Sequence, residues 1–84
     1  MYSVEYSKQS IRALRRMPAN TAMLIRNKIT SLALDPFVAQ GVKKLADRDE
    51  YRLRVGNWRV LYVLENRQLK VLIMDIGPRG GIYQ

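Results

Sequence analysis

The segment YRLRVGNWRVLYV, residues 51–63, carries three arginines within eight residues: Arg52, Arg54 and Arg59. The planar guanidinium group of arginine forms bidentate hydrogen bonds with phosphate, and several such groups can stabilise the extra charge of a pentacovalent phosphorane. Further along the chain, the segment IGPRGGIYQ adds Arg79 and Tyr83. A tyrosine can stack on a base or handle a proton. These residue types suit RNA cleavage in which a 2′-hydroxyl attacks the adjacent phosphate.

The chain has no histidine and no cysteine. It therefore lacks the commonest general base, the commonest zinc ligand and any thiolate nucleophile. Its seven carboxylates form no evident metal-ligand motif. Arginine is a poor general base because it does not deprotonate readily. We therefore expect metal-independent chemistry without a cofactor, and the sequence leaves the general base unidentified.

The 84 residues include 15 Lys and Arg against 7 Asp and Glu, which gives a net charge of +8. Such an excess favours polyanionic partners, namely nucleic acid, an anionic membrane surface or an acidic protein, although a basic protein without a particular partner is the simpler alternative. The first ten residues lack the apolar region of a signal peptide, and the longest apolar run, VLYVL, is far shorter than the about 20 residues of a membrane helix. We expect one domain over residues 1–84, cytoplasmic and without a membrane partner.

Hydrophobic periodicity and turn residues predict seven elements. Strands are expected at residues 2–6, 42–45, 51–55, 58–64 and 69–76. Helices are expected between Ser7, a suitable N-cap, and Pro18, and from about residue 20 to residue 34. The order β-α-α-β-β-β-β predicts an α+β fold in which an αα-hairpin packs on one face of an antiparallel sheet.

The dipeptide Gly56-Asn57 predicts a two-residue type II′ turn, because glycine supplies the positive φ of its first position. This turn sets Arg54 opposite Arg59 and makes one apolar face that packs on the helices, formed by Tyr51, Leu53, Val55, Trp58, Val60 and Tyr62. Arg52, Arg54 and Arg59 converge on the other face. Like charges placed opposite each other are destabilising. An anion-binding site explains this arrangement better than a solvated polar face does.

A turn over residues 65–68 sets the expected register of the last strand, with Leu61 opposite Leu72, Arg59 opposite Met74 and Trp58 opposite Asp75. The chain then leaves the sheet near the Gly56-Asn57 turn. A turn at Gly77 and Pro78 is expected to bring Arg79 beside Arg54 and Arg59, with Tyr83 within reach.

The arginine face also carries an apolar group, formed by Leu61, Val63, Leu72 and Met74. An exposed apolar patch on a small protein usually marks a partner site. The alternative is that a loop such as residues 36–50 covers it.

The hairpin Y-R-L-R…W-R-V-L-Y, the terminal I-G-P-R-G-G-I-Y and the element order together resemble the RelE/ParE toxin superfamily, specifically the RelE-like mRNA interferases. The resemblance covers nearly the whole chain. It implies a RelE-like two-layer fold and a toxin of a type II toxin–antitoxin module. It also implies cleavage of mRNA in the ribosomal A site to a 2′,3′-cyclic phosphate, and inhibition by a tightly bound, usually acidic antitoxin.

The resemblance also assigns roles to the candidate residues. Arg52 and Arg54 stand where well-known RelE-like toxins have lysines, Arg59 and Arg79 match arginines that contact or stabilise the scissile phosphate, and Tyr83 matches a tyrosine that stacks on the substrate base. Arginine at position 52 or 54 keeps the charge but makes proton abstraction there less plausible. The histidine and glutamate pair used by some relatives is missing.

Three functions follow as hypotheses. The first is a ribosome-dependent mRNA endoribonuclease that inhibits translation, with a cognate antitoxin and mRNA in the ribosomal A site as partners, and operator DNA only as a complex with the antitoxin. The second is a ParE-like inhibitor of DNA gyrase. The third is an inactive toxin relic that binds only its antitoxin or operator DNA.

Overall fold

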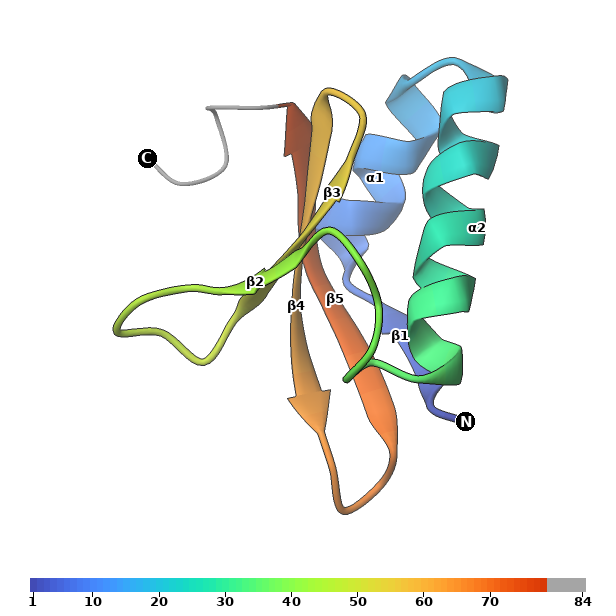
Figure 1. Ribbon diagram of the computed structural model, residues 1–84. Helices are drawn as coiled ribbons and strands as arrows, with labels where there is room; N and C mark the ends of the chain where they lie inside the picture. Colours follow the sequence, from blue (N-terminus) through green and yellow to red (C-terminus); the bar gives the residue numbers. More distant parts are fainter. Residues whose placement is uncertain (79–84) are drawn as a thin grey trace.

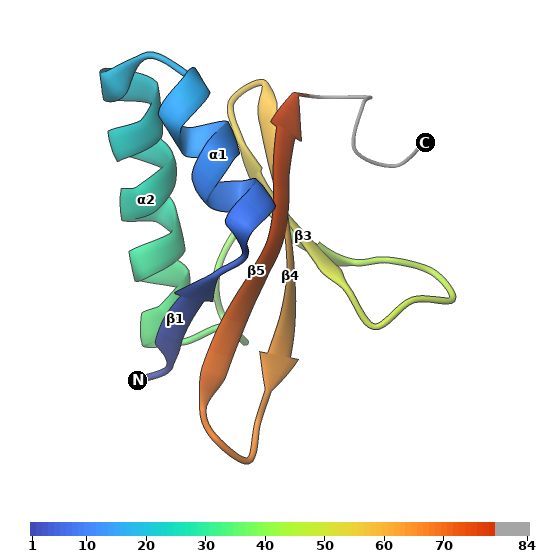
Figure 2. The same cartoon turned by 180° about the vertical axis from the view of Figure 1, so that it is seen from behind.

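Two helices and five strands make up the fold, which the computed structural model describes over residues 1–78. In chain order they are β1 (Ser3–Tyr6), α1 (Lys8–Arg16), α2 (Ala19–Leu34), β2 (Val42–Lys44), β3 (Tyr51–Val55), β4 (Trp58–Glu65) and β5 (Lys70–Pro78). Both helices lie on one side of the sheet, and the loop between β2 and β3 projects from the other side (Figures 1 and 2). The predicted element order and α+β class are confirmed.

The five strands form one sheet in the order β1-β5-β4-β3-β2. The pairings from β2 through β5 are antiparallel, as predicted. β1 is the exception, because it pairs in parallel with β5, with Val4 opposite Val71. The alternating pattern of residues 2–6 predicts a strand but contains no information on its direction, so only the structure shows this parallel edge.

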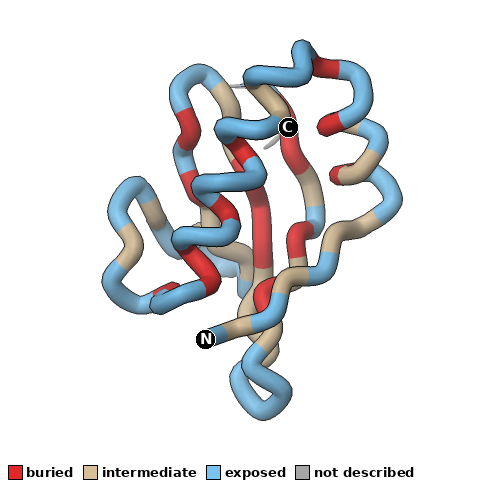
Figure 3. Tube along the Cα trace, turned by 90° about the vertical axis from the view of Figure 1, so that its right-hand side faces the viewer, coloured by how far each residue is buried: buried red, intermediate tan, exposed pale blue. Residues whose placement is uncertain are grey.

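The core lies between the helices and one face of the sheet. The helices contribute Leu14, Met17, Ile25, Ile29, Leu32 and Ala33, and the strands contribute Leu53, Val55, Val60, Tyr62, Val71, Ile73 and Ile76. Figure 3 shows these buried segments along the central strands and the helices. Tyr51 and Trp58 are partly buried and pack against the core. The apolar face predicted for the hairpin is therefore confirmed.

The β3–β4 hairpin has the predicted register, with Val55 opposite Trp58 and Arg54 opposite Arg59. Gly56 has a φ of +58°, whereas Asn57 is not among the residues of positive φ in the described chain. A type II′ turn needs positive φ at its first central position alone, so this glycine fixes the turn and, through it, the register.

The register between β4 and β5 differs from the prediction. Leu61 lies opposite Asp75, Arg59 opposite Gly77 and Trp58 opposite Pro78. Glu65 pairs with Lys70, so the turn lies one residue further along the chain than expected, which shifts each partner on β5 by two residues, and Leu69 adopts a φ of +53° in this turn. Bulky residues rarely adopt positive φ, so the local sequence gave little sign of this turn. Gly77 and Pro78 are consequently part of β5 and do not form the expected turn.

A β-bulge shifts the register between β4 and β5 by one more residue. The register changes between Leu61 and Tyr62, which leaves Met74 without a partner on β4. Ser7 supports the bulge, because its Oγ donates a hydrogen bond to the Met74 carbonyl at 2.9 Å and its N–H donates to the Ile73 carbonyl at 2.9 Å. The same Oγ accepts a hydrogen bond from the Ser10 N–H at 3.1 Å and so caps α1. One hydroxyl thus joins the start of α1 to the bulge of β5.

Candidate nucleic-acid interface

Two rows of residues cross the sheet on the face away from the helices. In the first row, Arg54 lies opposite Arg59, and Arg59 lies opposite Gly77. At the other end, the Arg54 N–H donates a hydrogen bond to the Gly41 carbonyl at 2.9 Å. A glycine therefore lies at each end of this row and adds no side chain that would cover the guanidinium groups.

The second row runs parallel to the first, two residues further from the Gly56 turn. Lys43 lies opposite Arg52, Arg52 opposite Leu61, and Leu61 opposite Asp75. The two rows together bring four cationic side chains onto one face from three adjacent strands. The predicted convergence of the hairpin arginines on this face is thereby explained by the strand register.

An open hollow of about 370 Å³ lies on this face, lined by Lys43, Lys44, Leu45, Ala46, Arg52 and Arg59. Of the predicted site residues, Arg52 and Arg59 line the hollow and are partly buried, while Arg54 is exposed beside Arg59. Basic side chains beside the apolar side chains of Leu45 and Ala46 are suited to a phosphate and its attached nucleoside.

Arg52 lines the hollow without an acidic partner among residues 1–78. Its Nε is buried but finds no hydrogen-bond acceptor within residues 1–78, and the side chain makes no ion pair in that part of the chain. A buried donor without a partner is unfavourable unless a ligand supplies the acceptor. An anion bound in the hollow would therefore meet a guanidinium group that no carboxylate of residues 1–78 neutralises.

Lys43 is a residue that the sequence reasoning missed. The pattern of VKKL predicts a short strand, but it does not identify the neighbouring strand in the sheet. Pairing β2 with β3 in antiparallel fashion places Lys43 opposite Arg52. The signal that could have revealed it is the loop of six residues between Lys44 and Tyr51, which favours a hairpin.

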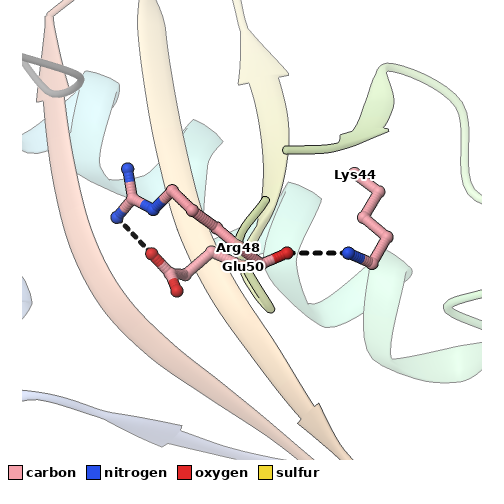
Figure 4. A network of polar contacts seen from close by, with 3 residues as sticks. All are labelled: Lys44, Arg48 and Glu50. Atoms are coloured by element: carbon pink, nitrogen blue, oxygen red, sulfur yellow. Dashed lines mark hydrogen bonds and ion pairs between the residues drawn. The ribbon is translucent and has the colours of Figure 1, made fainter. Parts of the chain in front are cut away.

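The β2–β3 loop is organised by polar contacts at the edge of the hollow (Figure 4). The Lys44 Nζ donates a hydrogen bond to the Arg48 carbonyl at 2.7 Å, and the Arg48 guanidinium pairs with the Glu50 carboxylate. The Leu45 N–H donates to the Glu50 carbonyl at 3.0 Å, and Asp47 turns the chain at a φ of +59°. These contacts hold the loop beside Arg52.

The apolar group expected on the arginine face is divided. Leu61 is only 4% exposed, although it is not part of the core between helices and sheet, so it is covered on the open face. Val63 and Leu72 are half-buried, and Met74 is 44% exposed. Leu72 and Met74 line a second, smaller hollow of about 180 Å³ that reaches Tyr6 and Ser7. The part of the apolar group near β1, formed by Leu72 and Met74, therefore remains accessible.

Arg79 and Tyr83 lie outside the described residues. β5 ends at Pro78 opposite Trp58, so the chain reaches the Gly56 end of the sheet, as predicted.

Two described tyrosines have altered acidity. Burial raises the pKa of Tyr62, with a further contribution from Tyr51, and burial raises the pKa of Tyr6 against the opposing effect of Arg26. Tyr62 belongs to the core and Tyr6 lies by the second hollow, so neither serves the arginine face.

Within residues 1–78, no group of three or more acidic side chains is placed to hold a metal ion. Over the same range, neither helix is long and apolar enough to cross a membrane.

Comparisons with known proteins show which family model and which curated protein the chain resembles. A family model described as the ParE toxin of type II toxin-antitoxin system, parDE, matches residues 4–83. The curated protein "Putative toxin RelE1" of Methanocaldococcus jannaschii is 29% identical over 86 residues, which cover 99% of this chain and 96% of that protein.

Two solved structures are similar over nearly their whole length. The toxin in the archaeal RelE–RelB complex from Pyrococcus horikoshii has a TM-score of 0.82 and 28% identity, covering 95% of this chain and 97% of that one. The matching chain of the RelBE2 toxin–antitoxin complex from Mycobacterium tuberculosis has a TM-score of 0.81 and 21% identity, covering 93% of this chain and 98% of that one, and this likeness concerns the fold alone.

Proposed function

Because the chain belongs to the family of ParE toxins of type II toxin–antitoxin systems, within the RelE/ParE superfamily, we propose that it acts as a ribosome-dependent mRNA endoribonuclease. The observation that carries the proposal is the hollow lined by Arg52, Arg59 and Lys43, in which the Arg52 Nε lacks an acceptor within residues 1–78. A surface that only binds protein does not require this arrangement of donors around a space for a phosphate.

The proposed reaction is an internal transfer at one phosphate of the mRNA. The 2′-oxygen attacks phosphorus, the bond to the 5′-oxygen breaks, and the products are a 2′,3′-cyclic phosphate and a 5′-hydroxyl. Arg52, Arg54, Arg59 and Arg79 stabilise the negative charge that builds up on the phosphate oxygens, and Tyr83 stacks on a neighbouring base. The proton of the 2′-hydroxyl passes to a base from solvent or the ribosome, and the 5′-oxygen takes up a proton.

The proposed partners follow from the charge of the chain and from its relatives. The net charge of +8 suits both mRNA in the ribosomal A site and an acidic protein. The similar structures from Pyrococcus horikoshii and Mycobacterium tuberculosis are complexes of toxin with antitoxin. We therefore assign a cognate antitoxin as the inhibitor, with operator DNA bound only by the complex and with activity in the cytoplasm.

Inhibition of DNA gyrase is the second candidate function. It is favoured by the description of the matching family model, which names a ParE toxin. A gyrase inhibitor needs a protein-binding surface but no cluster of phosphate ligands. The two functions therefore differ in whether the arginine face is needed for toxicity.

The test is primer extension on cellular mRNA after brief expression without antitoxin. For the wild-type protein we expect cuts confined to translated reading frames. In the R59A variant we expect these cuts to disappear and growth to resume, because removing a phosphate ligand from such a site typically lowers the rate about 100-fold or more. The matched control is K28A, which removes one exposed charge from α2 on the helix side. Growth arrest with intact mRNA would support gyrase inhibition, and normal growth would indicate an inactive relic.

A further inference from the structure

Glu50 lies on the arginine face but does not pair with an arginine of the proposed site. The Leu45 N–H donates to its carbonyl at 3.0 Å, so the β2–β3 ladder continues through Glu50 beyond the Tyr51 pair. Side chains two residues apart on a strand share a face, so Glu50 and Arg52 point to the same side. The Glu50 carboxylate nevertheless pairs with Arg48, and Arg52 makes no ion pair within the described chain.

The loop is built so that Arg48 reaches Glu50. The Lys44 Nζ donates a hydrogen bond to the Arg48 backbone carbonyl at 2.7 Å (Figure 4). The positive φ of Asp47, +59°, lies in the turn that precedes Arg48. The side chain of Glu50 is 24% exposed and that of Arg48 is 45% exposed, so solvent reaches both partners of the ion pair. Arg48 does not line the hollow itself, whereas Arg52 does.

A carboxylate is the natural competitor of a phosphate for an arginine. Both present two oxygens that match the guanidinium fork, so a carboxylate bound to Arg52 would have to be displaced before a phosphate could bind. An ion pair with Arg48 keeps Glu50 occupied and partly neutralises its charge. Arg52 then stays available, in agreement with its unsatisfied Nε.

We propose that Arg48 is a positioning residue that holds Glu50 away from Arg52, so that Arg52 remains available to a phosphate of single-stranded RNA. The inference rests on the proposed function, because it assigns Arg52 to the RNA phosphate. Arg48 acts through Glu50 and needs no contact with the RNA. Removing Arg48 therefore harms binding only while Glu50 keeps its charge.

The test uses mRNA-programmed ribosomes and measures KM and kcat for mRNA cleavage by the wild-type protein and by R48Q, R48K, E50Q and R48Q/E50Q. In R48Q we expect KM to rise about fivefold, the upper range for an exposed ion pair, with kcat nearly unchanged. R48K keeps a partner for Glu50 and should resemble the wild type. R48Q/E50Q should also return to the wild-type KM, and K28Q on α2 controls for the loss of one positive charge.

Each result decides the matter. Recovery in R48Q/E50Q supports the inference, because a structural or RNA-contacting role of Arg48 would not be restored by changing Glu50. An R48Q/E50Q variant as weak as R48Q would overturn it, and so would an R48Q variant equal to K28Q. If R48Q fails to fold, E50Q still tests the inference, since a KM raised by losing this carboxylate contradicts it. A failure of the proposed function can be told apart from these results, because the wild-type protein itself would then leave mRNA intact. The inference about Arg48 would then fail together with the proposed function.

Discussion

Arg54 and Arg59 lie directly opposite each other on β3 and β4, a position where like charges oppose strand pairing. We expect the R54Q variant to be more stable by about 0.5 kcal/mol, since cross-strand charge effects lie in that range. The same variant should cleave mRNA less well, because a phosphate ligand is lost. Urea denaturation and the cleavage assay measure the two effects, and R12Q, on the exposed side of α1, is the control. Equal losses of stability and activity in R54Q would contradict this explanation.

Tyr62 is fully buried, and its hydroxyl finds no hydrogen-bond partner within residues 1–78. Burial raises its pKa above the ordinary 10.0. Above pH 10 the unfolded chain therefore loses this proton while the folded chain keeps it. The unfolded state then binds fewer protons, so stability falls with rising pH, by up to about 1.4 kcal/mol per unit.

The Y62F variant removes this ionisation. It should be as stable as the wild type at pH 7, or up to about 1 kcal/mol more stable, because a buried hydroxyl without a partner is removed. Between pH 10 and pH 11 its free energy of unfolding should fall less steeply than that of the wild type. Urea titrations at pH 7, 10 and 11 measure both effects. A clearly less stable Y62F at pH 7 would show that the hydroxyl contributes a favourable contact.

Residue-level features were predictable where a local rule determines them. Gly56 fixed the hairpin turn, and the turn fixed the positions of Arg52, Arg54 and Arg59 relative to one another. Lys43 was not predicted, because its position depends on pairing between β2 and β3 across a loop. The ion pair of Arg48 with Glu50 was beyond prediction for the same reason, since it depends on how that loop folds.

At the scale of elements, the bulge at Met74 and the N-cap of α1 depend on one side chain. The Ser7 Oγ accepts from the Ser10 N–H and donates to the Met74 carbonyl. We expect S7A to lose about 1–2 kcal/mol of stability, from the lost cap and the unsatisfied carbonyl. Urea denaturation measures the loss, and S3A in β1 is the control because Ser3 is exposed.

The bulge also sets where the end of β5 lies. It moves the last residues of β5 by one position along β4, which brings Gly77 opposite Arg59. S7A should therefore lower cleavage activity as well as stability. Activity unchanged at a temperature where S7A remains folded would show that the end of β5 keeps its register without Ser7.

The helices illustrate which elements a sequence predicts well. Both helices were expected from their apolar period, and their apolar residues Leu14, Ile25, Ile29 and Leu32 are all buried. The β4–β5 register was predicted wrongly because two departures from regular geometry, the positive φ of Leu69 and the bulge at Met74, are stabilised by distant residues. Tyr2, for example, donates to Asn66 in this turn at 2.9 Å.

At the scale of the whole molecule, positive charge lies on both layers. α1 and α2 contain no acidic residue but carry Lys8, Arg12, Arg15, Arg16, Arg26 and Lys28. Between them lies a hollow of about 390 Å³ whose lining includes Met17, Met23 and two of these arginines. The net charge predicted a polyanionic partner, but composition could not assign it to a layer. The structure provides one cationic surface on the helices and another on the sheet, so an acidic protein and RNA need not compete for the same residues.

The parallel pairing of β1 with β5 has a consequence for the synthesis of the protein. Val4 meets Val71, so the first strand has no neighbour in the sheet until almost the entire described chain has emerged. Contacts between residues so far apart in sequence form late, because a long loop must close first. β4, which carries Arg59, also lacks one of its two neighbours until β5 arrives. A nascent chain interrupted before β5 would have neither a finished sheet nor a finished arginine surface, so an activity that depends on this surface would be absent until translation of the protein was nearly complete.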